Sequence, residues 1–520
     1  MNGAGALIRT LVAAGVDTCF TNPGTSEMHF VAALDGVPGM RGVLALFEGV
    51  ATGAADGYGR MAGRPAATLL HLGPGLGNGL ANLHNARRAW TPVVNIVGDH
   101  ATYHTKYDAQ LQSDIETVAR NVSAFVRTSA STAALAGDAV DAVRAALGPP
   151  GQVATLILPA DVSWTEGGTP VELSGPLTAT TGTAPDADVV DAAAKALRSG
   201  EPAALLIGGR ACRTPLLDQL SALAEATGAK LLCETFPARL ERGQGRPEVE
   251  RIAYLAEFAA MQLDGVRHLV LVDAKSPVTF FAYPNKASDL VPDGCTVHPL
   301  ATAASDVAGA VAALTDALGA TGTRPRHTAA ERPGLPEGAL DAAKVCQAIG
   351  ALLPEGAIVS DEGNTAGVFA AGATAGAPPH DWLTLTGGAI GQGLPVAVGA
   401  AVACPDRRVL ALEADGSSLY TIQSLWTMAR EGLDVTTVLL NNGSYAVLNM
   451  ELQRVGADAG GPKARAMLDL HHPDLDFVSV ARGLGVQAER ATTAEAFNDA
   501  LGRALATPGP SVIEAMVAPL

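Results

Sequence analysis

The sequence has no excess of positive charge and no long apolar segment, and each absence excludes a class of protein. Its 520 residues carry 35 basic and 52 acidic side chains, a formal net charge of −17. This charge repels phosphate backbones and anionic membrane surfaces alike. No apolar run approaches the roughly 20 residues needed to cross a bilayer. We therefore expect a small-molecule partner, and neither a nucleic acid nor a membrane.

Cysteine is also scarce: six are present, far apart and without a CxxC pair. This spacing signals neither a zinc site nor a dense disulfide framework, so a reducing cytoplasm is the expected compartment. The first residues, MNGAGALIRTLVAAG, have no basic region before their apolar run and no clear cleavage site. We interpret them as an amphipathic helix and not as a signal peptide.

Two stretches rich in Gly, Pro, Thr and charge divide the chain into thirds. They begin at Thr165 and Gly319 and lack apolar periodicity, as linkers do. The length of the chain also favours two or three domains over a single core. We therefore predict domains at residues 1–165, 186–320 and 338–520.

Each third alternates short apolar runs with longer Ala-rich patterns of helical spacing. The runs are AATLLHL, PVVNIVGD, ATLILPAD, PAALLIGG, HLVLVDA, AIVSDEG, RVLALEAD and TTVLLNNG. Buried strands that end in Gly, Asp or Asn and lead into helices are typical of parallel α/β layers, whose ligand loops lie at the carboxyl ends of the strands. The predicted fold class is α/β, with three doubly wound, mostly parallel sheets.

Asp415 and Asn442 follow two of these predicted strands. One helical pattern lies between them, so both side chains are expected at the same sheet edge although they are 27 residues apart. A carboxylate, an amide oxygen and a backbone carbonyl such as that of Ser444 are hard oxygen ligands that suit Mg²⁺ and leave room for phosphate oxygens. Backbone N–H groups at Gly416 and Ser417 could contact the same phosphate. Taken singly, Asp415 also fits a helix cap and Asn442 a turn.

This arrangement resembles the diphosphate-binding motif of thiamine-diphosphate enzymes, usually written GDG followed by NN. The first Gly of that motif is Ala414 here, which a backbone with negative φ accepts. FEGVATGAADGYGRMAGRPA, residues 47–66, is similar to the helix that carries the catalytic glutamate, and LTLTGGAIGQGLPVAVGAA, from Leu383, is similar to the cofactor-clamping segment. The likeness covers nearly the whole chain and is closest to the acetolactate synthase and benzoylformate decarboxylase branch.

The resemblance implies two cofactors, thiamine diphosphate and Mg²⁺, held between the first domain of one subunit and the third domain of another. The assembly is then a homodimer at least, and commonly a homotetramer. The implied metal ligands are Asp415, Asn442 and Ser444. The implied cofactor contacts are Thr25, Glu48, Asn78, Asn364, Thr365, Gly388, Ile390, Asp415, Gly416, Ser417, Asn442, Ser444 and Tyr445.

Some of these contacts have a specific implied role. Ile390 matches the apolar wedge that bends the cofactor into a V, and Gly388 matches the place where a backbone carbonyl receives the 4′-amino group. Asn364 and Thr365 match a polar pair that contacts the diphosphate, although a turn rich in Gly and Asn fits the same letters.

Glu48 matches the catalytic glutamate. The protein's task in thiamine chemistry is to generate the ylid and hold it against the substrate. A buried carboxylate beside N1′ of the aminopyrimidine can share a proton with that nitrogen, and the apolar neighbours Leu46, Phe47 and Val50 predict such burial. The alternative is a glutamate that only stabilises the start of a helix.

His71, at the end of the predicted strand AATLLHL and before the glycine loop GPGLGNG, matches the active-site histidine of benzoylformate decarboxylase, and Asn78 and Thr25 match other site positions. An imidazole there can position the carboxylate of a 2-oxo acid or relay protons. A histidine at a strand end can also be a satisfied polar group. His100 and His104 could line the same cavity, although no family motif indicates it.

Two other classes of protein fit parts of the sequence. GPGLGNG, with Asp99 following, suggests a dinucleotide-binding loop, but its glycines recur every second residue and the GxGxxG spacing fails. A non-catalytic cofactor-binding homologue would not need Glu48, which is present. FAD is not expected, because no flavin motif is recognisable in the middle domain.

The sequence leaves open whether the enzyme releases an aldehyde or transfers the carbanion to a second carbonyl compound. Benzoylformate decarboxylase uses a second histidine from its middle domain, whereas PVTFFAYPNK, residues 277–286, contains Phe280 and Phe281 and no histidine. Without that proton donor we predict an acetolactate-synthase-like carboligase, with pyruvate as the first donor to try. A non-ligating 2-oxo acid decarboxylase is the alternative.

Overall fold

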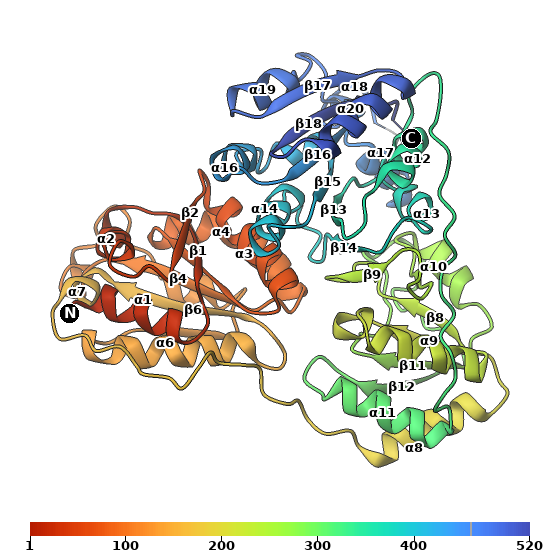
Figure 1. Cartoon of the computed structure of the whole chain (residues 1–520), viewed down its shortest axis with the longest axis horizontal. Helices are drawn as coiled ribbons and strands as arrows, with labels where there is room; N and C mark the ends of the chain where they lie inside the picture. Colours follow the sequence, from red (N-terminus) through yellow and green to blue (C-terminus); the bar gives the residue numbers. More distant parts are fainter. Residues whose placement is uncertain (458–459, 520) are drawn as a thin grey trace.

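Three mostly parallel sheets follow one another along the chain, which confirms the predicted α/β class (Figure 1). The computed structural model describes residues 1–457 and 460–519. The predicted third domain is therefore described except for residues 458–459 and 520.

The first sheet has the strand order β2-β1-β3-β4-β6-β5, and every neighbouring pair is parallel. Its strands are β1 (Thr18–Asn22), β2 (Arg41–Leu44), β3 (Ala66–Leu70), β4 (Val93–Asp99), β5 (Phe125–Thr128) and β6 (Val153–Pro159). The helices are α1 (Gly3–Ala13), α2 (Met28–Leu34), α3 (Glu48–Ala62), α4 (Leu72–Arg88), α5 (Ile115–Ala119), α6 (Thr132–Leu147) and α7 (Ala160–Trp164). The helix expected from the first residues is α1, which the Asn2 side chain caps by accepting from the Gly5 N–H at 2.9 Å.

The second sheet has the order β10-β8-β7-β11-β12. It contains β7 (Ala203–Ile207), β8 (Lys230–Cys233), β10 (Glu250–Arg251), β11 (His268–Val272) and β12 (Thr296–Ala301). The helices of this part are α8 (Ala187–Arg198), α9 (Leu216–Thr227), α10 (Ala256–Leu263) and α11 (Val307–Leu318). β9 (Leu240–Arg242) lies between β8 and β10 in the sequence but is not part of this sheet. It pairs antiparallel with β14 (His380–Thr384) of the third sheet, so the middle segment is joined to the last third of the chain.

The third sheet has the order β17-β18-β16-β15-β13-β14-β9. Its own strands are β13 (Ile358–Glu362), β14 (His380–Thr384), β15 (Val409–Ala414), β16 (Val435–Asn441), β17 (Gln487–Ala491) and β18 (Ser511–Met516). The helices are α12 (Ala342–Leu352), α13 (Ala370–Ala373), α14 (Gly393–Ala403), α15 (Asp415–Ser418), α16 (Ser424–Glu431), α17 (Ala446–Arg454), α18 (Pro462–Ala466), α19 (Phe477–Gly483) and α20 (Ala494–Ala506). The single crossover helix predicted between Asp415 and Asn442 is thus two, α15 and α16.

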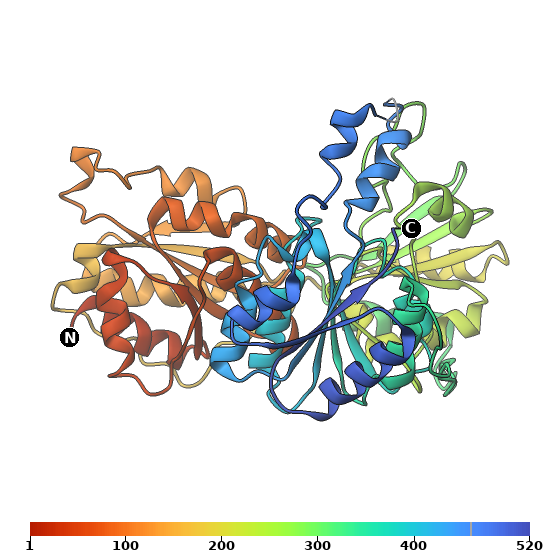
Figure 2. The ribbon, with the colours of Figure 1, turned by 90° about the horizontal axis from the view of Figure 1, so that it is seen from above.

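Helices α3 and α14 join the first and third sheets, and Figures 1 and 2 show them side by side between the two. Glycines allow the close approach: a Cβ on Gly57 would lie 2.1 Å from the Val396 carbonyl oxygen, and one on Gly399 would lie 1.9 Å from that of Ala54. Apolar side chains of both sheets and both helices share one buried cluster. The two sheet edges considered below are therefore held by a common core.

The glycine run after β3 differs from the predicted loop. Gly73, Gly75 and Gly79 lie inside α4. A Cβ there would lie 1.8 Å from the Ser113 hydroxyl, 3.2 Å from a Glu48 carboxylate oxygen and 2.8 Å from a Thr52 methyl, respectively. The glycines serve close packing and not a turn.

Within residues 1–457 and 460–519, no helix combines the length and the apolar character that crossing a membrane requires.

Candidate functional site

The carboxyl ends of β15 and β16 bring Asp415 and Asn442 together, as the strand pattern predicts. Asp415 is 2% exposed, and its carboxylate accepts three backbone N–H groups: Gly416 at 2.7 Å, Asn442 at 2.9 Å and Gly443 at 2.7 Å. Burial raises the pKa of Asp415, and the three N–H donors oppose that rise. Ala414 precedes it with φ −87°, so the departure from the family's glycine costs no backbone strain.

The oxygens at this edge fit a hard cation. Asp415 Oδ1 accepts one N–H, and Asn442 Oδ1 accepts one, from Ser444 at 2.9 Å, so each oxygen keeps a lone pair. Among the residues that the structure describes, no three His, Cys, Asp or Glu side chains gather as a metal site. A cation would rest here on one carboxylate together with amide and carbonyl oxygens, the donor types that Mg²⁺ accepts.

Polar groups that could contact a diphosphate lie at the neighbouring strand end. The Asn364 amide, in the turn after β13, donates to the Ser417 hydroxyl at 2.9 Å. Asn364 has φ +47°, a left-handed conformation that Asn tolerates better than most residues. Thr365 lies half-buried in the same turn. Gly416 faces the Tyr445 ring, and a Cβ would lie 2.4 Å from a ring carbon, so this corner admits no side chain at 416.

The loop after β14 contains Gly388 and Ile390, the latter half-buried. Gly388 has φ +75°, and a Cβ would lie 2.5 Å from the Phe280 ring. The buried Glu362 carboxylate holds the end of this loop by accepting the N–H groups of Gly391 at 2.7 Å and Gly393 at 2.5 Å. Burial raises the pKa of Glu362 to about 7. Sequence reasoning missed Glu362, although it stands in the quoted run AIVSDEG.

Phe280 belongs to an aromatic cluster contributed by the middle segment. Its ring centroid lies 5.9 Å from that of Phe236, 5.4 Å from that of Tyr254 and 4.8 Å from that of Phe281. Phe280 and Phe281 remain 43% and 51% exposed. The cluster therefore stands beside Gly388 as an apolar, partly open wall.

On the first sheet, Glu48 is the first residue of α3 and is buried, as predicted, with 8% exposure. Its Oε2 accepts a hydrogen bond from the Asn78 amide on α4 at 3.0 Å. The structure therefore brings together two residues that the sequence separates by thirty positions.

His71 lies just after β3 and not within the strand; it occupies the N-cap position of α4, where its side chain makes no capping hydrogen bond. Its Nδ1 is 2.7 Å from Oε2 of Glu27. Thr25 opens the short 3-10 helix η1 (Thr25–Glu27) that ends in this glutamate, and is itself exposed. Sequence reasoning missed Glu27, which stands two residues after Thr25 in the NPGTSE stretch. The ring of His100 lies 5.2 Å from that of His104 on the loop after β4.

One asparagine links the two sheet edges. Asn82 of α4 donates to the Gly49 carbonyl, next to Glu48, at 2.8 Å and to the Gly391 carbonyl at 3.1 Å. The start of α3 and the loop that contains Ile390 therefore share a hydrogen-bonding partner within one chain.

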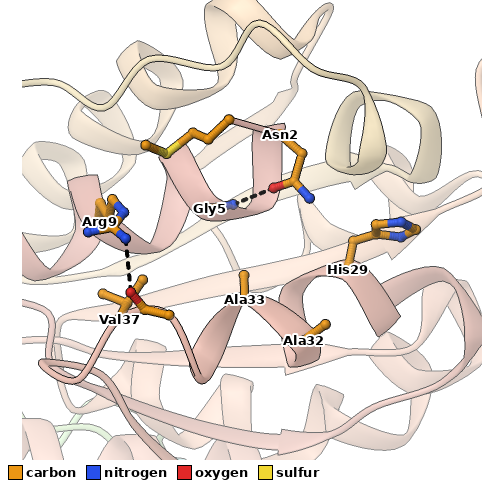
Figure 3. Close-up of a pocket in the computed structure, with 9 residues that line it drawn as sticks. Asn2, Gly5, Arg9, His29, Ala32, Ala33 and Val37 are labelled. Carbon is orange, nitrogen blue, oxygen red and sulfur yellow. Dashed lines mark hydrogen bonds between the residues drawn. The ribbon is translucent and has the colours of Figure 1, made fainter.

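Two surface pockets lie away from these residues. One, of about 260 Å³, lies between α1 and α2, where Arg9 donates to the Gly36 carbonyl at 2.9 Å (Figure 3). The other, of about 470 Å³, is lined by residues 328–333 and 372–376. Neither contains a predicted site residue, so neither changes the assignment of the candidate site.

Two family models match the chain. Residues 1–120 match the model described as thiamine pyrophosphate enzyme, N-terminal TPP binding domain. Residues 361–515 match the C-terminal TPP binding domain of the same description. Glu48 and His71 fall in the first range, and Asp415 and Asn442 fall in the second.

Individual proteins match over nearly the whole length. The chain is 61% identical over 518 residues to "Putative acetolactate synthase large subunit IlvX" of Mycobacterium tuberculosis, which covers 99% of each chain. It is 29% identical over 530 residues to a benzoylformate decarboxylase of Pseudomonas aeruginosa, which covers 96% of each. A solved 4-hydroxybenzoylformate decarboxylase of Rhodococcus jostii RHA1 superposes with a TM-score of 0.85 at 24% identity, over 100% of this chain and 99% of that one; this likeness bears on the fold alone.

Proposed function

Because the chain belongs to the thiamine pyrophosphate enzyme family, we propose that it is a carboligase of the acetolactate synthase type. It would decarboxylate a 2-oxo acid, with pyruvate as the first candidate, and join the remaining fragment to a second carbonyl compound. The observation that supports this choice is the contact of the Phe280 ring with Gly388. Phe280 belongs to residues 277–286, which contain no histidine. An apolar wall without an imidazole limits the access of water and lacks one proton donor for aldehyde release.

We assign the cofactor-holding groups from the geometry of the third sheet. Asp415, Asn442 and the Ser444 carbonyl would hold Mg²⁺, and Asn364 with the N–H groups of α15 would contact the diphosphate. Thiamine diphosphate, when bound, supplies the electron sink for the bond electrons that are freed as CO₂ leaves.

The remaining residues act on protons and shape. Glu48, buried and held by Asn78, would share a proton with the pyrimidine. Ile390 would support the bent cofactor, and the Gly388 carbonyl would receive its amino group. His71 would face the carboxylate or carbonyl of the 2-oxo acid.

We further propose that two copies of the chain complete the site. Large apolar side chains stand exposed beside the site segments: Leu46 is 44% exposed next to Glu48, and Leu419 and Tyr420 are 39% and 54% exposed after α15. Such side chains are typically covered at a subunit interface.

A non-ligating decarboxylase is the second candidate, and His71 favours it. This histidine lies at the exit of β3 with its ring held by Glu27, and an imidazole so placed can protonate the fragment that departs as an aldehyde.

Product analysis separates the two candidates. Purified protein with thiamine diphosphate and MgCl₂ is given pyruvate or benzoylformate, each with and without an aldehyde acceptor, and products are identified by NMR. We expect a 2-hydroxy ketone or 2-hydroxy-3-oxo acid from pyruvate. If aldehyde accounts for nearly all the carbon released with every acceptor, the decarboxylase takes the carboligase's place. In Phe280→His, which introduces an imidazole into residues 277–286, the aldehyde share should rise.

A further inference from the structure

Glu27 is a carboxyl group with no exposed surface, and it lies behind the ring of His71. Its Oε2 is 2.7 Å from His71 Nδ1 and accepts the Gly24 N–H at 2.8 Å. Its Oε1 packs against the backbone of Gly98 in β4, where a Cβ would lie 1.7 Å away. The side chain of Glu27 therefore has no room to turn away from His71.

The imidazole ring is confined from a second side. A Cβ on Gly24 would lie 2.3 Å from Nδ1 of His71, so the ring rests directly on the backbone of the loop after β1. The His71 side chain keeps 24% exposure, and within the described part of the chain its Nε2 makes no hydrogen bond. One ring nitrogen is thus bound to the protein, while the other is left for a ligand.

The two nitrogens of a neutral imidazole differ, since one donates a hydrogen bond and the other accepts. A carboxylate only accepts. Beside an ionised Glu27, Nδ1 must therefore hold the proton, which leaves the lone pair on Nε2.

We propose that Glu27 is a positioning residue that fixes His71 as the Nδ1–H tautomer, so that Nε2 is the atom that takes up a proton from solvent, passes it to the carbonyl oxygen of the 2-oxo acid and takes it back when the product leaves. This rests on the proposed function for the step it serves, but the tautomer itself is a property of the free protein. The arrangement has the logic of a carboxylate that orients a catalytic histidine from behind.

Other titratable groups surround the pair. Asp99 ends β4 and His100 follows it, Asp161 lies on α7 and His29 lies on α2, and all three elements pack against η1. Asp99 accepts the His100 N–H at 2.7 Å, and Asp161 accepts from the Thr102 hydroxyl. Burial raises the pKa of Glu27, and the Gly24 N–H and His71 oppose that rise.

The test is ¹⁵N NMR of cofactor-free protein labelled at histidine, at a pH where the ring is neutral, with His71→Asn to assign the signals. We expect Nδ1–H and a bare Nε2 in the parent. Glu27→Gln should keep this tautomer, because its amide oxygen can accept the same N–H groups, whereas Glu27→Met should populate both tautomers. An Nε2–H tautomer in the parent, or an unchanged tautomer in Glu27→Met, would overturn the proposal.

Kinetics give the second arm of the test. Glu27→Met should lower the rate of product formation by about 10- to 100-fold, up to the lower end of the roughly 10²- to 10⁴-fold contribution of a positioned acid–base group, with thiamine diphosphate affinity unchanged. Glu27→Gln should recover most of that loss. If the parent shows the expected tautomer but no activity on any 2-oxo acid, the proposed function fails while the assignment of Glu27 stands.

Discussion

Asp415 accepts a 2.7 Å hydrogen bond from the backbone N–H of Gly443, although the two residues are 28 positions apart. The bond joins the exits of β15 and β16, the neighbouring parallel strands that end at this edge. With Asn442 and Gly416 also donating, one carboxylate organises both turns. The same group is thus required for the shape of the edge and is available to a cation.

Asp415→Asn should weaken thiamine diphosphate binding by orders of magnitude. The variant removes the single negative charge of the proposed metal site, and its amide nitrogen would face a backbone N–H donor, at a cost of about 1–3 kcal/mol in unfolding free energy. Calorimetric titration with MgCl₂ measures the affinity. Melting temperatures with and without cofactor separate lost binding from lost stability.

Asn449→Ala is the matched control for this prediction. The Asn449 amide donates to the Ser444 hydroxyl at 3.0 Å, beside the site but outside the predicted ligand set. Its affinity should stay close to the parent's. Parental affinity in Asp415→Asn would contradict the metal assignment.

Gly388→Ala should disturb the loop that contains Ile390. A left-handed backbone costs a residue with a Cβ about 1–2 kcal/mol, and at Gly388 the Cβ would also meet the Phe280 ring at 2.5 Å. Gly63→Ala is the control, because Gly63 has φ +66° with open space around the added Cβ. We expect denaturant unfolding to show a larger loss of stability in Gly388→Ala than in Gly63→Ala.

A second substitution separates the two causes at Gly388. Adding Phe280→Ala to Gly388→Ala removes the contact and leaves the φ cost. The stability lost through Gly388→Ala should be smaller in the Phe280→Ala background than in the parent. An equal loss in both backgrounds would show that Phe280 does not pack against Gly388.

Glu234 should make the parent less stable as pH rises. Burial raises its pKa from 4.5 to about 7, so between these values the folded chain binds a proton that the unfolded chain has released. The contribution of Glu234 to the free energy of unfolding is then largest below about pH 4.5, falls until about pH 7 and is flat above. Because one unit of pKa shift corresponds to about 1.4 kcal/mol, the decline from this half-buried group should be about 1–3 kcal/mol.

The comparison that isolates Glu234 is Glu234→Gln against the parent at pH 5 and pH 8. The variant should gain stability relative to the parent at the higher pH. Glu355→Gln, at an exposed position, should show no such difference. A constant offset between Glu234→Gln and the parent at both pH values would refute this role.

Much of the fold was predictable because buried parallel strands appear in a sequence as apolar runs that end in polar turns. For this reason the sequence alone places Asp415 and Asn442 at one edge of a sheet. Close packing has no such pattern in the sequence. The glycines of GPGLGNG suggest a loop, whereas Gly73 and Gly79 lie in α4 and pack against other segments.

Contacts between distant segments were also beyond the sequence. The role of Glu27 depends on a turn that brings it to the end of β3, where it contacts His71. The role of Glu362 depends on the N–H groups of Gly391 and Gly393, which it accepts. Each carboxylate occurs in a stretch singled out for another residue, and nothing in the local pattern says which side chain turns inward.

The most direct test of the account follows the C2 proton of thiamine diphosphate bound to the parent and to Glu48→Gln. Glutamine keeps an oxygen for Asn78, which donates at 3.0 Å in the parent, so the cofactor should still bind. Without the carboxylate, exchange of the C2 proton with deuterium, followed by NMR after acid quench, should slow by roughly 10²- to 10⁴-fold. Equal exchange rates in the two proteins, at full cofactor occupancy, would contradict the role of Glu48. They would also contradict the assignment of the catalytic site to the start of α3.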